Sequence, residues 1–224
     1  QLESSMDLAE LEELYRPYKR KKKTKAKMAK EAGLGDFAEW VWRLGHGELQ
    51  DNTSLEVKAK DYINPTAGFA TYDEVLRGAQ HIIVERLSNN GNLRKLVRDD
   101  YFAHGVVVCQ KGKKYKTNSK YEKYADYREP VKSLESKKAS HRYLALRRGW
   151  NEAELTVSIE ANDAQLLQAF EAEALSVPQS QSGEFLKNCA KIALTVHVVP
   201  SVANELHGKL KNQADQYAIQ VFAE

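Results

Sequence analysis

A run of positive charge near the start of the chain has the clearest chemistry in the sequence. Between residues 16 and 30, RPYKRKKKTKAKMAK contains nine lysines or arginines and no acidic residue, although the 224-residue chain carries a net charge of only +3. Like charges at this density repel one another, so they persist only where water solvates them or an anion faces them. The phosphate backbone of a nucleic acid is the obvious anion. The competing interpretation is a solvated turn between two helices.

We call residues 16–30 the basic joint, because Pro17 should end one helix just before a second one begins. Its lysines and arginines are the first-rank candidates for contacts to phosphate. These candidates are Arg16, Lys19, Arg20, Lys21, Lys22, Lys23, Lys25 and Lys27.

A second basic stretch lies between residues 111 and 148. It has thirteen lysines or arginines against four acidic residues, interleaved with tyrosines at positions 115, 121, 124 and 127. Lysines that follow phosphates and rings that stack on bases are typical of a single-strand-binding surface. The alternative is a partly mobile, solvated loop whose tyrosines pack locally. In this stretch, Arg142, Arg147 and Arg148 are second-rank candidates for nucleic-acid contacts.

The sequence lacks the motifs of common catalytic and cofactor sites. There is no Walker loop, dinucleotide-binding glycine fingerprint, HExxH motif or nucleophile elbow. The six histidines are scattered, and none is spaced i, i+4 from another histidine or from a cysteine. We therefore expect no enzymatic activity, metal site, cofactor or small-molecule substrate.

The cysteines and the hydropathy pattern bear on the compartment. Cys109 and Cys189 are alone and far apart, which favours reduced, buried thiols over a disulfide. No apolar run approaches the roughly 20 residues that a membrane span needs, and the chain does not begin with a signal peptide. These features predict a cytoplasmic protein without a membrane partner.

Cap signals and apolar periodicity predict that most of the chain is helical. Thr24 is a candidate N-cap for a helix over residues 25–32, and Thr71 with Glu74 forms a capping box for a longer helix. Ser140 is expected to cap a helix that ends at Gly149. A helix that opens near residue 182 should be interrupted at Pro200.

One segment alternates as a strand does. Leu155, Val157 and Ile159 are separated by polar residues, so residues 154–160 should form a short strand, although its partner is not evident. Residues 106–108 could either extend a helix or form a second strand.

The fold class that follows is mainly α and multihelical, in one lobe or two, with minor β in the short strand near 154–160. We expect a helical region over residues 1–130 that contains the basic joint at 16–30. Residues 131–224 should form a second helical region that holds the strand and continues into a downstream domain.

Four blocks of the sequence resemble one family. LEELYRPYKRKKKTKAKMAKEAGL is similar to the LEDLYxPYKxKRRTKAxxAxEAGL signature of the bacterial Tex transcription accessory proteins. Further similar blocks are YINPTAGFATYDEVLRGAQHIIVERLS, YADYREPVKSLESKKASHRYLALRRGWNEAELTVSIE and ADQYAIQVFAE. The resemblance implies a role in transcription. It also implies an internal fragment, because family members carry a helix-turn-helix-like region before this part and RNase H-like, helix-hairpin-helix and OB-type RNA-binding domains after it.

Two functional hypotheses remain open from the sequence. The first is a non-catalytic helical scaffold that binds RNA or DNA without sequence preference through lysine and arginine contacts to phosphate, and that works with the transcription machinery. The second is an architectural or protein-interaction module that positions the other domains and has no nucleic-acid affinity of its own. In that case the basic joint pairs with the acidic helix at residues 7–13 or with an acidic partner.

Overall fold

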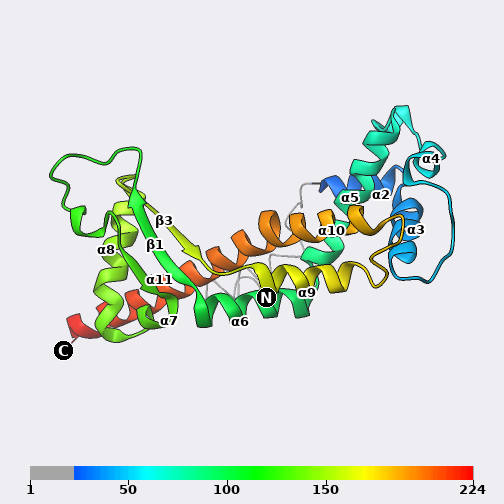
Figure 1. Ribbon diagram of the computed structural model, residues 1–224. Coiled ribbons are helices and arrows are strands. Elements are labelled where there is room, and N and C mark those ends of the chain that lie inside the picture. Colours follow the sequence, from blue (N-terminus) through cyan, green and yellow to red (C-terminus); the bar gives the residue numbers. More distant parts are fainter. Residues whose placement is uncertain (1–22, 224) are drawn as a thin grey trace, which may run out of the picture.

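The computed structural model describes residues 23–223, which form helices and one small sheet (Figure 1). The helices are α2 (Lys25–Glu31), α3 (Gly35–Gly45), α4 (Leu55–Lys60), α5 (Tyr72–Ser88), α6 (Gly91–His104), α7 (Val131–Leu134), α8 (Ser140–Asn151), α9 (Ala164–Ala174), α10 (Gly183–Ile192) and α11 (Val199–Ala223). The strands are β1 (Val106–Lys111), β2 (Arg128–Pro130) and β3 (Leu155–Glu160). The shorter turns are η2 (Pro65–Ala67), η3 (Glu122–Tyr124), η4 (Lys137–Ala139) and the π-helical η5 (Ala193–Val198). The predicted mainly α fold with minor β is confirmed.

The molecule is elongated (Figure 1). Helices α2 to α5 lie at one end, and the sheet with α8 lies at the other. Helices α6, α9, α10 and α11 connect the two ends. This arrangement separates α2, which holds part of the basic joint, from the second basic stretch, which begins at the last residue of β1.

Two predicted helix caps are confirmed. The Thr24 hydroxyl accepts a hydrogen bond from the Lys27 N–H at 3.1 Å and so caps α2. At the start of α5, the Thr71 hydroxyl accepts from the Glu74 N–H, and the Glu74 carboxylate accepts from the Thr71 N–H at 3.1 Å. Each cap satisfies backbone donors that the first turn leaves free.

The sheet resolves the two uncertain segments. Strand β3 alternates buried and exposed side chains as predicted, and its partner is β1, antiparallel, with Val107 opposite Ile159. Strand β2 pairs with the other edge of β1, so the strand order is β2-β1-β3. Three consecutive residues of β1, from Val107 to Cys109, are buried. A strand buried on both faces has no alternation, which is why periodicity could not separate it from a helix.

The prediction that Pro200 interrupts the last helix is wrong. Helix α10, the π-turn η5 and α11 form one continuous helical run from Gly183 to Ala223. In the π-turn the Val199 N–H donates to the Leu194 carbonyl, five residues back. This wider register precedes Pro200 directly, so the missing N–H of the proline does not force the chain to turn. At about 1.5 Å per residue the run is roughly 60 Å long.

The predicted limits of α8 are also wrong. Ser140 donates its hydroxyl to the Lys137 carbonyl and does not cap the helix, and α8 continues past Gly149 to Asn151. Gly149 has a packing role instead, because a Cβ there would lie 2.7 Å from Leu155 Cδ1 and 3.2 Å from Tyr121 Cδ1. Only a glycine lets β3 and Tyr121 approach the helix this closely.

The buried side chains form one cluster that extends from Ala26 on α2 to Ala214 on α11. Both cysteines are free and buried, as expected, and burial raises the pKa of Cys109 to about 11 and that of Cys189 to about 12. The division of the chain near residue 130 stays a prediction. Within residues 23–223, no helix has the length and apolar character needed to cross a membrane.

Candidate nucleic-acid interface

Only the second half of the basic joint belongs to the described part of the chain. Arg16, Lys19, Arg20, Lys21 and Lys22 lie outside the described residues. The remaining lysines lie on or next to α2, whose buried Ala26 and Ala29 pack the helix against α5. Lys23, Lys25, Lys27 and Lys30 are all exposed around this buried stripe.

Half of the exposed lysines on or next to α2 already have acidic partners. Lys23 pairs with Glu31 at 2.8 Å, and Lys30 pairs with Glu85 of α5 at 2.9 Å. The hydrogen bond from Lys23 holds the pKa of Glu31 below its usual value, and the hydrogen bond from Lys30 does the same for the pKa of Glu85. Both carboxylates are therefore ionised at neutral pH and neutralise part of the joint. Among the described residues, Lys25 and Lys27 have no carboxylate partner.

Two of the three second-rank arginines are partly buried and engaged by other side chains of the protein. Arg142 of α8 donates to the Glu129 carboxylate at 2.7 Å, and this hydrogen bond raises the pKa of the arginine. Arg147 stacks its guanidinium over Trp150, 4.7 Å from the ring centroid. The Nε of Arg147 is buried and has no hydrogen-bond partner in the described residues. Arg148, in contrast, is exposed, and no described carboxylate pairs with it.

Arg147 also lies beside a buried histidine that joins α8 to α11. The Tyr143 hydroxyl donates to the His207 carbonyl at 3.0 Å and lies 2.9 Å from its Nδ1. Burial, with a smaller contribution from the charge of Arg147, lowers the pKa of His207 to about 4. This histidine is therefore neutral at physiological pH, and the cluster links the helix under the sheet to the long C-terminal helix.

The first part of the second basic stretch, from the last residue of β1 into η3, forms a loop, which we call the lysine loop (residues 111–123). Its lysines are Lys111, Lys113, Lys114, Lys116, Lys120 and Lys123. Among the described residues only Lys120 has a carboxylate partner, Glu152, at 3.0 Å. Five lysines of this segment are therefore exposed to solvent with no carboxylate partner among residues 23–223.

Specific hydrogen bonds hold the lysine loop in place. The Gly112 and Lys114 N–H groups donate to the carbonyls of Glu154 and Ala153, at 2.8 and 2.9 Å. The buried Glu154 carboxylate accepts from the Ser119 hydroxyl. These contacts tie the loop to the turn between α8 and β3, so the lysines extend from a fixed backbone.

The tyrosines of this stretch pack locally. Tyr121 and Tyr124 are only 4% and 6% exposed, and Tyr121 donates its hydroxyl to Glu152 at 2.9 Å. Tyr124 packs edge-on against Tyr127, with 5.6 Å between ring centroids. Buried rings cannot stack on bases, so these tyrosines anchor the loop and leave its lysines outside. Of the two sequence-based alternatives, local packing holds for Tyr121 and Tyr124.

A family model described as Tex central region-like matches residues 50–222. The chain belongs to this family. It is similar to the uncharacterized protein YdcI of Bacillus subtilis, with 34% identity over 100% of this chain and 30% of that protein. It is also similar to the transcriptional accessory protein Tex of Neisseria gonorrhoeae, with 30% identity over 100% of this chain and 29% of that protein. Protein tex of Bordetella pertussis is 30% identical over 95% of this chain and 27% of that protein.

The resemblance to the Tex family read from the sequence is thus confirmed. The chain spans about 30% of the length of these curated relatives. The family-model match includes the lysine loop and α8 but begins after the basic joint, whereas the alignments with the B. subtilis and N. gonorrhoeae relatives cover the whole chain.

Sequence reasoning about this Tex central region-like chain missed the lysines that are most available. Lys113, Lys114 and Lys116 were not among the candidate residues, while the paired Arg142 and the stacked Arg147 were. A local signal for them existed, since residues 111–121 contain five lysines and no acidic residue, with glycine and asparagine typical of turns.

Proposed function

We propose that this chain is the helical scaffold and nucleic-acid-binding portion of a Tex-like transcription accessory protein. It is non-catalytic, uses no metal or cofactor, and acts in the cytoplasm on RNA or DNA together with the transcription machinery. Support comes from the family and from a relative whose printed name is transcriptional accessory protein Tex. The single observation that carries the nucleic-acid contact is the set of five lysines on the lysine loop without a described acidic partner.

Binding of this kind neutralises phosphates and reads no base edges. A lysine near a phosphate releases a condensed counterion, so affinity falls with salt in proportion to the number of contacts. The basic joint adds Lys25 and Lys27 together with Arg16, Lys19, Arg20, Lys21, Lys22 and Lys23. Arg148 adds one more exposed cation on α8.

An architectural role is the second candidate, and specific contacts favour it. Arg94 and Arg98 of α6 both pair with Glu205 of α11, at 2.7 and 2.8 Å. Together with the uninterrupted run from α10 to α11, these pairs support a stiff strut that would hold other domains apart. In this case the lysines keep the surface solvated, and nucleic acid does not bind.

The test measures fluorescence anisotropy of labelled single-stranded RNA, single-stranded DNA and duplex DNA at several salt concentrations. We expect binding whose log affinity falls with log salt by about 0.7–0.9 per phosphate neutralised. In a variant with Lys113, Lys114 and Lys116 changed to alanine, the magnitude of that slope should be smaller by about 2–3.

The matched control removes three lysines that are each paired within one helix, through Lys95→Ala, Lys187→Ala and Lys211→Ala. It lowers the net charge by the same amount and should keep the wild-type slope. An equal loss of slope in both variants would mean that net charge alone acts. No binding at low salt would favour the architectural role.

A further inference from the structure

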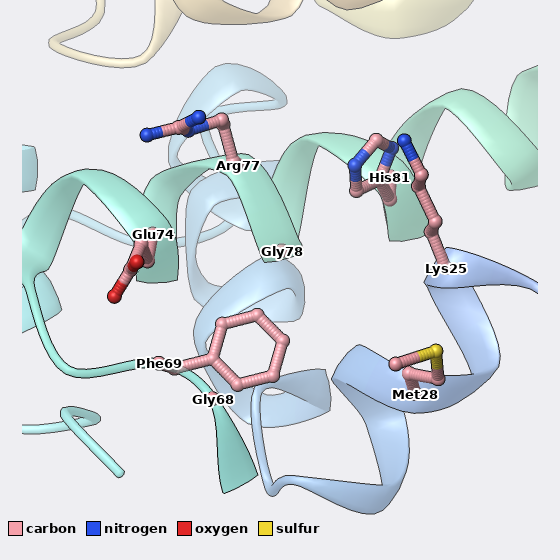
Figure 2. Close-up of a pocket in the computed structure, with 8 residues that line it drawn as sticks. All are labelled: Lys25, Met28, Gly68, Phe69, Glu74, Arg77, Gly78 and His81. Atoms are coloured by element: carbon pink, nitrogen blue, oxygen red, sulfur yellow. The ribbon is translucent and has the colours of Figure 1, made fainter. Parts of the chain in front are cut away.

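A small pocket lies between α2 and α5, directly beside the basic joint (Figure 2). Its volume is about 260 Å³. Sites that enclose a drug-sized ligand usually measure roughly 300–1,000 Å³. This pocket therefore has room for one planar base and not for a whole cofactor.

Apolar groups form the floor of the pocket. Figure 2 shows Phe69, from the loop before α5, between that helix and α2, with Met28 of α2 beside it. Gly78 makes this close approach possible, because a Cβ there would lie 2.9 Å from Phe69 Cε1 and 2.4 Å from Leu34 Cδ1. Met28 is 51% exposed. The pocket thus offers an aromatic ring and a polarizable thioether to a ligand.

Cationic groups line the rim of the same pocket. Lys25 and Arg77 contribute to the lining, and neither has a carboxylate partner among the described residues. The Glu74 carboxylate at the far side accepts hydrogen bonds from the N–H groups of Ala70 and Thr71, at 2.7 and 3.1 Å. The helix cap therefore already engages this acid. The rim remains positive over an apolar floor.

His81 completes the lining next to Lys25 (Figure 2). Burial lowers the pKa of His81, and the charges of Lys25, His197 and Arg77 lower it further. The positive charges of Lys25 and Arg77 next to this histidine favour an anion at the same place.

We propose that the pocket binds one unpaired nucleotide of a single-stranded nucleic acid, with its base against Phe69 and Met28 and its phosphate at Lys25 and Arg77. A phosphate alone needs no apolar floor, and an apolar group alone needs no unpaired cations. The proposal rests on the proposed function, because the basic joint would bring the strand to the edge of the pocket. A duplex keeps its bases stacked and cannot fill the site. Stacking on a ring tolerates any base.

The test uses the full chain and a single strand with 2-aminopurine at one position, beside the matching duplex. Binding should change 2-aminopurine emission in the single strand only, because the base leaves the stack of its neighbours. Phe69→Leu and Met28→Ala should each weaken single-strand affinity by about fivefold or more and leave duplex affinity unchanged. Lys25→Ala should weaken both, since it removes a phosphate contact. The upward shift of the His81 pKa on binding, followed by NMR, is a second readout.

The control is Leu96→Ala, an exposed apolar side chain on α6 away from the pocket. Phe69 packs against the core, so circular dichroism is used to check that the Phe69→Leu variant folds. Met28 is exposed, so Met28→Ala should fold normally and tests the pocket even if the Phe69 variant does not. If strands bind with a salt slope but the pocket variants and 2-aminopurine emission do not respond, the pocket proposal is wrong and the proposed function stands. If a labelled acidic peptide binds and Met28→Ala weakens its binding, while 2-aminopurine emission does not respond, a protein ligand replaces the nucleotide. If no nucleic acid binds at all, both proposals fail.

Discussion

The two basic regions hold their lysines in different ways. On α2, Lys23 and Lys30 pair with Glu31 and Glu85, whereas five of the six lysines of the lysine loop have no described acidic partner. The basic joint has the higher density of charge in the sequence, yet among the described residues the loop has five lysines without an acidic partner and the joint has two, Lys25 and Lys27. The fold decides this availability, because Glu85 lies 55 positions beyond Lys30 in the chain.

The supports under the two regions also differ. Helix α2 is fixed to α5 by two small side chains and by one surface ion pair, Lys30 with Glu85. The lysine loop rests on buried tyrosines, on Gly149 and on the α8–α11 contact at His207. Changes to the core should therefore affect the loop, and changes to surface charge should affect α2.

The largest expected effect comes from Gly149→Ala. The added Cβ overlaps Leu155 and approaches Tyr121, and overpacking of this kind costs about 1–3 kcal/mol. Chemical denaturation measures the loss, and hydrogen exchange should show reduced protection in residues 111–123 but not in α2. The matched control is Gly208→Ala on α11, where a Cβ meets nothing within 4 Å. This variant should be as stable as wild type or up to about 1 kcal/mol more stable. Equal destabilisation by both changes would contradict the packing role of Gly149.

A second effect should appear on acidification. His207 has a pKa of about 4 in the folded protein and 6.5 as an exposed histidine. Between these two pH values the histidine is protonated in the unfolded chain and neutral in the folded chain. The contribution of His207 to the free energy of unfolding is therefore fully present above pH 6.5 and is lost as the pH falls towards 4. At pH 5 the loss is about 2 kcal/mol. The carboxylates that pair with α2 have lowered pKa values and still carry charge at that pH.

Acid should therefore loosen the lysine-loop end more than the α2 end, where His81 also has a lowered pKa but is less buried than His207. Denaturation at pH 7 and pH 5 measures the total, and protection factors locate it. His207→Gln should flatten the pH dependence over this window, and the exposed His141→Gln should not. A pH dependence that survives in His207→Gln would show that another group causes it.

A third prediction concerns the distance between the two regions. The helical run that connects the two ends is roughly 60 Å long, which corresponds to about 18 base pairs at 3.4 Å each. A 30-base-pair duplex can reach both regions, whereas a 10-base-pair duplex can reach only one. We therefore expect the longer duplex to bind about tenfold more tightly, once the larger number of overlapping binding positions on the longer duplex is taken into account. Lys25→Ala with Lys27→Ala should remove this advantage. Lys187→Ala with Lys211→Ala, which removes two paired lysines, should retain it. A length advantage that is equal in both variants would mean that α2 does not contribute.

Much of the fold could be predicted from the sequence because its signals are local. The caps at Thr24 and Thr71 and the alternation of β3 involve neighbours within a few residues, and they hold in the structure. Pro200 and Gly149 were misjudged because their role depends on a π-turn and on a contact with β3. A prediction made from neighbouring residues cannot include a contact that only the folded chain creates.

The candidate site was less predictable for a similar reason. The density of lysines indicates where anions could bind, but it does not show which lysines the fold neutralises. Arg142 meets Glu129 across the α8–β2 contact, and Lys30 meets Glu85 across the α2–α5 contact. Both pairs form only when separate elements come together.

The smallest expected effect follows from this neutralisation. Glu85→Gln removes the acid that pairs with Lys30 and accepts from the Thr24 hydroxyl, while it keeps nearly the same shape. The Lys30 side chain is 52% exposed, so the loss of stability should stay within about 1 kcal/mol. The freed lysine should add one phosphate contact, and the salt slope for nucleic acid should rise by about 0.7–0.9.

Glu39→Gln is the matched control, because it frees Arg86, which also stacks on Trp42 at 4.1 Å and so remains held. This change should leave the slope at its wild-type value. If Glu85→Gln also leaves the slope unchanged, α2 does not face the nucleic acid, and the internal pairs do not limit binding. If the slope rises only in Glu85→Gln, then the acids that the fold brings to a basic segment determine how much of its charge a ligand can use.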